Sequence, residues 1–150
     1  MKDGTDYIRT ETLHMALIKV LRVHKRRANS EFCKIGMTQG QPKILDFLSE
    51  SDGCIQRELA ENCNIEPATV TSLLASMEKA GLIYRTQNSK DKRVLNVFLT
   101  DKGKVRQKEV EKVFNLMDEE CFQGFSEEEK VQTMRILNKI YENMIRKERG

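Results

Sequence analysis

The sequence lacks a long hydrophobic run, because its longest uninterrupted apolar stretch is four residues, Met15 to Ile18. A membrane-spanning helix needs about 20 apolar residues, so no segment is expected to cross a bilayer. Residues 1–14 mix charged and polar side chains and contain no apolar core of the kind found in export signals. We therefore expect a cytoplasmic protein with no membrane partner.

Proline, which breaks helices, is also rare. Tryptophan is absent and the 150 residues include two prolines, whereas Leu, Ile, Met, Glu and Lys are abundant. This composition favours a mostly helical chain. With 39% apolar and 33% charged residues, the chain is too apolar for a disordered tail. Its length suits one domain with helical extensions.

Groups that could perform catalysis are scarce. The chain has two histidines and no glycine-rich phosphate loop, and the hydroxyl groups of residues 68–76 have no nearby histidine or paired acid. We therefore predict that the protein is not an enzyme and has neither a cofactor nor a metal site. His14 and His24 lie about 15 Å apart along a helix, too far to share a metal. A site made of His24, Glu31 and Cys33 is the alternative for metal sensing.

The four cysteines show no C-x-x-C spacing, and an even number of thiols in a cytoplasmic protein is not a disulfide framework. Cys54 and Cys63 flank one predicted helix and lie about 13 Å apart, beyond the reach of a disulfide. These two and Cys121 lie on or beside apolar stripes and are expected to be small buried hydrophobic residues.

Hydrophobic periodicity and capping signals divide the chain into helices with one pair of strands. A capping box at residues 38–41 and another at 126–129 mark two helix starts. The predicted elements are helices over residues 8–27, 39–48, 55–63, 67–80, 101–121 and 127 onward, strands over 82–87 and 94–99, a loop over 28–37, and turns at 64–65 and 88–93.

The helix predicted from Pro67 has two different faces. Val70, Leu73, Leu74 and Met77 form an apolar stripe, whereas the opposite face carries small, uncharged side chains rich in hydroxyl groups. The side chains of that face are Ala68, Thr69, Thr71, Ser72 and Ser76. Because solvated helix faces usually carry Glu and Lys, this face is suited to close approach to another molecule.

The charges of the central segment are sorted along the chain. The total of +3 does not by itself indicate nucleic acid, but basic residues gather after the helix that begins at Pro67. They are Arg85, Lys90, Lys92 and Arg93, with Asp91 as the one opposing charge. The cluster indicates either a basic surface for nucleic acid or a solvated turn.

Two short helices joined by a tight turn and followed by a hairpin predict a winged helix-turn-helix. In such a fold the second helix enters the major groove of double-stranded DNA and the hairpin reaches the adjacent minor groove. The flanking helices are amphipathic and too long for this small domain to cover, so we expect them to pair with those of a second copy. A homodimer would place two reader helices about 34 Å apart, one turn of DNA.

We therefore predict a mostly α fold with a small β-wing, whose winged helix-turn-helix core is flanked by N- and C-terminal dimerisation helices. The predicted organisation has three parts: an N-terminal dimerisation helix and loop over residues 1–37, a DNA-binding domain over 38–100, and C-terminal dimerisation helices over 101–150.

Over residues 35–104 the chain resembles the MarR (multiple antibiotic resistance) family of transcriptional regulators. Five motifs occur in the order and spacing of that family. They are Glu58-Leu59-Ala60; Ala68-Thr69-Val70-Thr71 with Leu74; Gly81-Leu82-Ile83 with Arg85; Asp91-Lys92-Arg93; and Leu99-Thr100 followed by Gly103. The resemblance implies an intertwined homodimer that binds a pseudo-palindromic operator, usually as a repressor.

The resemblance also assigns roles to single residues. Arg93 corresponds to the minor-groove arginine, Asp91 to the carboxylate that orients it, and Arg85 to a backbone contact or a scaffold ion pair. The candidate DNA-binding residues are Pro67, Ala68, Thr69, Thr71, Ser72, Arg85, Lys90, Asp91, Lys92 and Arg93.

Two positions depart from the family pattern. Lys92 stands where a second arginine is common, and because lysine lacks the planar fork, we expect it to contact phosphate and not bases. Cys54-Ile55 stands where Ser or Thr often caps the first reader helix, so we expect that helix start to be frayed or capped differently.

Two switches remain open at this stage. Regulators that the chain resembles are often released by a small-molecule effector, for which the candidate lining residues are Leu17, Phe32, Met37, Phe47 and Phe114; the alternative is that these residues are simply core. The competing switch is redox sensing through Cys33, predicted in a loop beside Lys34, whose charge would favour a thiolate. A winged-helix module that binds proteins is the alternative from another functional class, and the basic wing argues against it.

Overall fold

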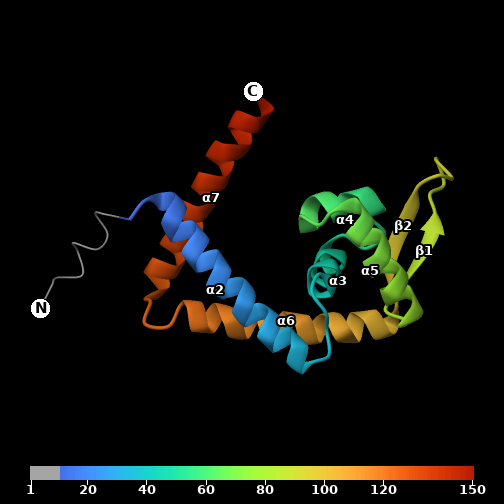
Figure 1. The fold of residues 1–150 in the computed structure, drawn as a ribbon, viewed down its shortest axis with the longest axis horizontal. Coiled ribbons are helices and arrows are strands. Elements are labelled where there is room, and N and C mark those ends of the chain that lie inside the picture. The colour runs from blue at the N-terminus through green and yellow to red at the C-terminus, as the bar shows by residue number, and fades with distance from the viewer. Residues whose placement is uncertain (1–10) are drawn as a thin grey trace, which may run out of the picture. The chain divides into compact units, whose positions relative to one another are not determined.

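The computed structural model describes residues 11–150. They form two compact units, one ending at Phe114 and the other running from Asn115 to Gly150. In chain order the elements are α2 (Leu13–Lys34), α3 (Gln41–Glu50), α4 (Gln56–Cys63), α5 (Pro67–Lys79), β1 (Ile83–Gln87), β2 (Leu95–Leu99), α6 (Asp101–Cys121) and α7 (Glu127–Arg149), as Figure 1 shows. This order confirms the prediction of a mostly helical winged helix-turn-helix.

The first described helix is longer than predicted. α2 continues to Lys34, so residues 28–34, predicted as a loop, are helical. The segment contains neither glycine nor proline, and the first glycine, Gly36, ends the helix with a φ of +69°. Phe32 is buried and adds a tertiary contact that favours helix at this end. The predicted start of this helix at residues 8–10 lies outside the described residues.

The C-terminal end of α2 packs on α6. The rings of Phe32 and Phe114 meet edge to face with their centroids 5.2 Å apart. The Arg106 guanidinium donates to the Ile35 carbonyl at 2.5 Å. These contacts explain why the segment after residue 27 stays ordered as helix.

The capping box predicted at residues 38–41 is displaced. The N-cap of α3 is Gly40, with a φ of +95°, and not Thr38. Gln41 retains its half of the motif, because its Oε1 accepts from the Thr38 backbone N–H at 3.4 Å. The positive φ explains the shift, since glycine adopts that conformation without steric cost.

α4 and α5 form the helix-turn-helix. α4 begins after Ile55, which has no side chain that can cap the helix. Its backbone N–H donates to Glu58 Oε2 at 3.2 Å, the part of a capping box that the carboxylate supplies. Asn64 makes the turn in the left-handed region with a φ of +52°, and Pro67 occupies the first turn of α5. The predicted turn and helix start are both confirmed.

β1 and β2 form the wing. They pair antiparallel from Ile83 opposite Leu99 to Gln87 opposite Leu95. An isolated bridge between Ile55 and Asn96 brings the loop before α4 against the outer edge of β2. The residues beyond the ladder, 88–94, therefore form a turn that projects past the last paired residues (Figure 1).

The core of the first unit is built from one face of each helix and from the inner residues of the hairpin. Its largest fully buried side chains are Ile44, Leu45, Leu48, Leu59, Val70, Leu74, Met77, Ile83, Val97 and Val110. Of the apolar stripe predicted for the helix at Pro67, Val70, Leu74 and Met77 are buried and Leu73 is partly buried against the core. The opposite face of the helix therefore points outward.

The start of α6 lies unusually close to the wing. Thr100 Oγ1 accepts from the Gly103 backbone N–H at 3.0 Å, as expected for a helix cap. A Cβ atom on Gly103 would lie 1.9 Å from the Leu82 carbonyl oxygen, so only glycine fits here. This contact joins the hairpin to the long helix.

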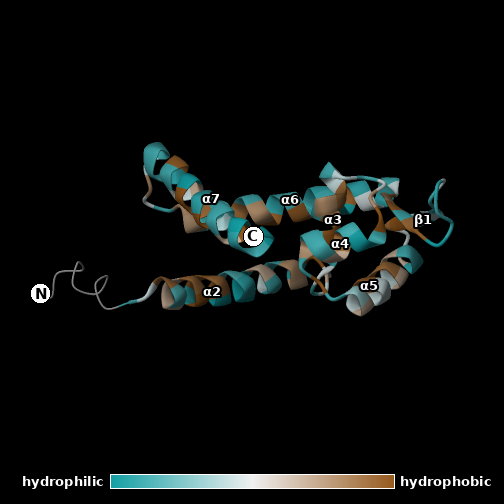
Figure 2. Ribbon diagram, turned by 90° about the horizontal axis from the view of Figure 1, so that it is seen from above, coloured by the Kyte–Doolittle hydropathy of each residue, from teal (hydrophilic) through white to brown (hydrophobic). Residues whose placement is uncertain are grey.

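α7 begins with the predicted capping box, in which Ser126 Oγ accepts from Glu129 N–H at 3.1 Å. None of its residues is buried. Large exposed apolar side chains recur along it and along α2. The ribbons of both helices show hydrophobic residues interspersed with hydrophilic ones (Figure 2). They are Val131, Met134, Ile136, Leu137, Tyr141 and Met144 on α7, and Leu13, Met15, Ile18, Val20, Leu21 and Val23 on α2.

Within residues 11–150, every helix is too short or too polar to traverse a lipid bilayer.

Candidate nucleic-acid interface

The outward face of α5 carries the small residues predicted to approach DNA. Pro67, Ala68, Thr69, Thr71 and Ser72 are all exposed. No side chain caps the helix start, so its first backbone N–H groups remain open to an anion. The face has no charge that would hold water strongly or keep a partner at a distance.

Two hydroxyl groups on this face, those of Thr71 and Ser72, are oriented by hydrogen bonds. Thr71 Oγ1 donates to the Pro67 carbonyl at 3.1 Å and accepts from Gln56 Nε2 at 2.9 Å. Ser72 Oγ donates to the Ala68 carbonyl at 3.3 Å. Gln56, at the start of α4, was not identified from the sequence, because its contact spans fifteen positions and leaves no local pattern.

The wing carries a bidentate ion pair at its end. Arg93 Nε lies 3.1 Å from Asp91 Oδ1, and an Arg93 terminal nitrogen lies 3.1 Å from Asp91 Oδ2. The Arg93 backbone N–H also donates to Asp91 Oδ1 at 3.0 Å. The Arg93 side chain is nevertheless 90% exposed, so the carboxylate orients the guanidinium without covering it.

The same contacts hold Asp91 in its ionised form. The side-chain hydrogen bonds from Arg93 lower the pKa of Asp91, and the backbone N–H of Arg93 lowers it further. The bond to Asp91 in turn raises the pKa of Arg93. Both groups stay charged at neutral pH, so the wing presents a fixed cation beside a fixed acceptor.

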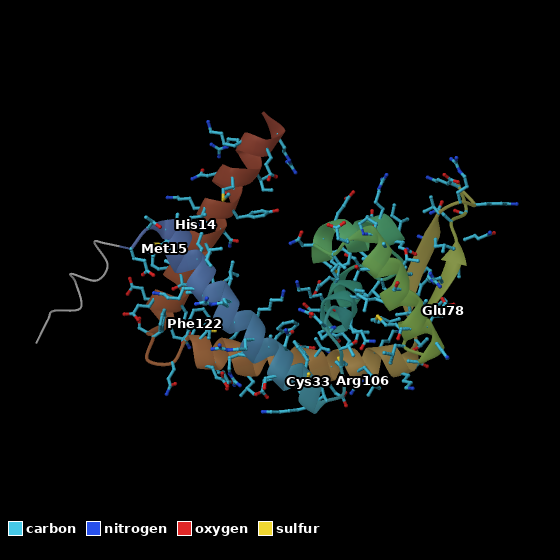
Figure 3. The ribbon with its side chains drawn as sticks, viewed as in Figure 1. His14, Met15, Cys33, Glu78, Arg106 and Phe122 are labelled. Carbon is cyan, nitrogen blue, oxygen red and sulfur yellow. The ribbon has the colours of Figure 1, made fainter. Side chains whose placement is uncertain are left out.

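The other basic residues of the cluster fall into two groups. Lys90 and Lys92 are exposed beside Arg93. Arg85 instead turns toward the end of α5, where its Nε lies 2.8 Å from Glu78 Oε2 and its side chain is only 20% exposed. Figure 3 shows Glu78 at this end of the helix. Of the two roles implied for Arg85, the structure displays the scaffold ion pair.

Two asparagines that the sequence did not single out support the wing. Asn88 Oδ1 accepts from the backbone N–H groups of Lys90 at 2.9 Å and Asp91 at 3.2 Å. Asn88 Nδ2 donates to Asn96 Oδ1 at 3.0 Å. Asparagine is common in turns, so the sequence held only a weak signal for Asn88, and none for its partner.

Most of the residues considered for an effector site lie in the core of the first unit. Phe32 and Met37 are buried in that core, and Phe47 and Phe114 are partly buried and pack against it. Leu17 is not among them, because fifteen helical residues place it about 22 Å from Phe32 along α2. A surface cavity of about 280 Å³ is lined by other residues, namely Leu48, Ser49, Asp52, Leu99, Lys104, Gln107 and Lys108.

Cys33 lies in the last turn of α2 and not in a loop (Figure 3). Its thiol is exposed. The neighbouring Lys34 ammonium lies 2.8 Å from Glu31 Oε1, so its charge is directed at a carboxylate. Its hydrogen bond is the main cause that lowers the pKa of Glu31. The support that Lys34 was expected to give a thiolate is therefore reduced.

The other cysteines differ in burial. Burial raises the pKa of the Cys54 thiol to about 11 and also raises that of Cys63. Cys121 is exposed and not buried as predicted, because it lies in the last turn of α6, outside the core of the first unit.

Among residues 11–150, no three His, Cys, Asp or Glu side chains of the chain converge in a way that could hold an ion. His24, Glu31 and Cys33 therefore do not form a site.

Comparison with known proteins yields one family. The family model described as MarR matches residues 37–95. The chain is 29% identical over 126 residues to the HTH-type transcriptional regulator YybA of Bacillus subtilis, covering 79% of each chain. It is 36% identical over 77 residues to the HTH-type transcriptional repressor MdtR of the same organism, covering 51% of this chain and 50% of MdtR.

Solved structures agree with these sequence relatives. A MarR family transcriptional regulator from Listeria monocytogenes, complexed with 26mer DNA, superposes with a TM-score of 0.81 at 25% identity and covers 90% of each chain. The S. aureus MepR–DNA complex superposes with a TM-score of 0.75 at 26% identity, covering 89% of this chain and 99% of MepR.

Proposed function

We propose that this chain is a transcriptional regulator of the MarR family, and that it acts as a homodimeric repressor that binds a pseudo-palindromic operator and leaves it when a small molecule binds. Its family and relatives are transcriptional regulators and not enzymes. Operator binding would place it in the cytoplasm with the genome.

One observation carries the DNA-binding part of the proposal. In one compact unit, an exposed helix face of small uncharged residues is combined with an exposed arginine whose guanidinium is held by Asp91. Small side chains allow the backbone of α5 to approach base edges in the major groove. An oriented arginine suits the narrow, electronegative minor groove. Lys90 and Lys92 would add phosphate contacts.

The dimer rests on the apolar stripes of α2 and α7. A 23-residue helix without a single buried residue gains little from its own fold. Met134, Leu137, Tyr141 and Met144 recur at intervals of three and four residues, the spacing of a helix that packs against another helix. Exposed apolar area of this kind marks an interface, and a second copy supplies a matching surface.

Repression and effector release rest on weaker support. MdtR is named as a repressor. The effector would bind near Phe32, in the core, and near Phe47 and Phe114, which pack against the core, because the resemblance implies a site between the dimerisation helices and the reader domain. No specific observation favours Cys33 as a redox switch over this arrangement.

The test is fluorescence anisotropy of the full-length protein on DNA from upstream of its own gene, with a scrambled fragment as the reference. We expect tighter binding to the genomic fragment and a steep loss of affinity as salt rises. Arg93→Ala should weaken that binding by about 1–3 kcal/mol and leave the dimer intact. Arg93→Lys is the matched control, because it keeps the charge and loses the fork.

Equal affinity of the parent and Arg93→Ala would contradict the role of the wing. A parent protein that binds both fragments alike would exclude autoregulation, and one that binds no DNA would favour a protein-interaction module. Peroxide is expected to leave the affinity unchanged, and loss of binding in peroxide that Cys33→Ser prevents would establish the redox alternative.

A further inference from the structure

The wing arginine depends on the conformation of a turn that the strand ladder does not hold. The ladder ends at the pair Gln87 and Leu95, so residues 88–94 lie beyond the last paired strand residues. A two-stranded hairpin is only marginally stable in water, and its end is its least restrained part. Something other than the two strands must fix the position of Arg93.

Asn88 organises this turn. Its side-chain oxygen accepts from the backbone N–H groups of Lys90 and Asp91, at 2.9 and 3.2 Å. Its own backbone N–H donates to the Val94 carbonyl at 2.8 Å, which closes the turn. Asp91, held by the second of these bonds, is the residue that pairs with the Arg93 guanidinium.

Asn96 connects Asn88 to the rest of the domain. Its side-chain oxygen accepts from Asn88 Nδ2 at 3.0 Å, and its own Nδ2 donates to the Gly53 carbonyl at 2.6 Å. Gly53 lies in the loop between α3 and α4, and its N–H donates to the Val97 carbonyl at 2.8 Å. An unbroken series of hydrogen bonds thus runs from this loop through both asparagines to Asp91 and Arg93.

Because both asparagines are partly buried, water cannot easily replace the hydrogen bonds of the series. Asn88 and Asn96 are half-buried, and each uses its amide as donor and acceptor at once. Half-buried amide bonds are shielded from competition by water, and removal of one partner leaves the other unsatisfied. An aliphatic side chain at either position would interrupt the series.

We propose that Asn88 and Asn96 are positioning residues for Arg93, through which the loop before α4 sets the orientation of the wing for DNA. The inference rests on the proposed function, because Arg93 is taken to be the DNA-contacting group. Neither asparagine needs to touch DNA.

The test combines two readouts on the full-length protein. Without DNA, ¹⁵N relaxation reports the order of residues 88–94, which we expect to fall in Asn88→Ala and in Asn96→Ala. With the operator fragment, each variant should bind about three- to tenfold more weakly, the change that loss of one net hydrogen bond produces. Ser89→Ala is the matched control, since Ser89 is an exposed polar residue of the same turn.

A double-mutant cycle with Arg93→Ala separates positioning from general damage. If the asparagines act through Arg93, their substitution should change affinity by less than about 1.5-fold once Arg93 is absent. Additive losses, or a wing as ordered in the variants as in the parent, would overturn the proposal. A parent that does not bind DNA specifically would overturn the proposed function, while the relaxation measurement would still decide whether the asparagines hold the wing.

Discussion

At the scale of single residues, the main feature of the wing is the ion pair between Asp91 and Arg93. Arg93 and Asp91 are two positions apart, and the carboxylate meets the guanidinium with both oxygens. Lys92, between them, has no fork and cannot form such a pair. One arginine of the cluster is therefore oriented for recognition, while the lysines contribute charge.

The Asp91 carboxyl should titrate below its ordinary value of 3.8, because Arg93 stabilises the ionised form. Because the pKa of Asp91 is lower in the folded protein than in the unfolded chain, ionised Asp91 stabilises the folded wing at pH values above the unfolded pKa. That contribution disappears as the pH falls through the folded pKa. DNA affinity should therefore not vary with Asp91 ionisation between about pH 6 and 8. An NMR titration of the side-chain carboxyl carbon measures this directly, and Arg93→Ala should return the pKa toward normal.

Thiol reactivity should separate the cysteines by burial. At pH 7.5 iodoacetamide should modify the folded protein at Cys33 and Cys121 alone, because the Cys54 thiol, with a pKa of about 11, and the buried Cys63 remain protonated. Mass spectrometry counts the adducts, and four should appear after denaturation. An adduct on Cys54 in the folded protein at this pH would show that the loop before α4 opens.

At the scale of elements, the junction between the hairpin and α6 leaves no room for a side chain at Gly103. Gly103 has a helical conformation, so alanine there would normally raise helix stability by up to about 1 kcal/mol. The Leu82 carbonyl, only 1.9 Å from the site of a Cβ, opposes that gain. The steric effect dominates, because a backbone oxygen cannot move without displacing the hairpin.

Gly103→Ala should accordingly lower the free energy of unfolding by about 2 kcal/mol, in the range of overpacking substitutions. Urea unfolding followed by circular dichroism measures the change. Lys112→Ala, an exposed position of the same helix, should change stability by less than about 0.5 kcal/mol. A Gly103→Ala variant as stable as the parent would show that α6 and the hairpin can separate at little cost.

At the scale of the whole molecule, the two units differ in how they are stabilised. Buried residues between Phe32 and Val110 form one apolar core, whereas α7 carries large apolar side chains that no part of the described chain buries. The winged domain can therefore fold around its own core. In the proposed assembly, a second copy covers the exposed apolar side chains of α7.

Charged substitutions on α7 should therefore dissociate the dimer without unfolding the winged domain. Leu137 and Tyr141 are 46% and 64% exposed, so lysine at both positions costs little within one chain but would place like charges in the interface. Light scattering should give the monomer mass of 17.4 kDa for the double variant and twice that for the parent. A parent that is monomeric, or a variant that stays dimeric, would exclude this interface.

The sequence by itself predicted the order and type of the elements, because the signals for them are local. Periodicity, capping residues and turn residues within a few positions predicted α4, α5, the hairpin and both long C-terminal helices. The pairing of Asp91 with Arg93, implied by the resemblance to MarR regulators, also joins residues that are close in sequence. These features depend on backbone geometry over one or two turns, which neighbouring residues largely determine.

Only the tertiary structure decided the contacts that join distant segments. The extension of α2 to Lys34 is stabilised by contacts with Phe114 and Arg106 of α6. Arg85 forms an ion pair with Glu78 and is not directed into solvent. The bonds from Gln56 to Thr71 and from Asn96 to Gly53 join different elements, and such bonds leave no periodic trace in the sequence. A side chain finds such a partner only after the helices and the hairpin have packed, because packing determines which polar groups end within hydrogen-bond distance.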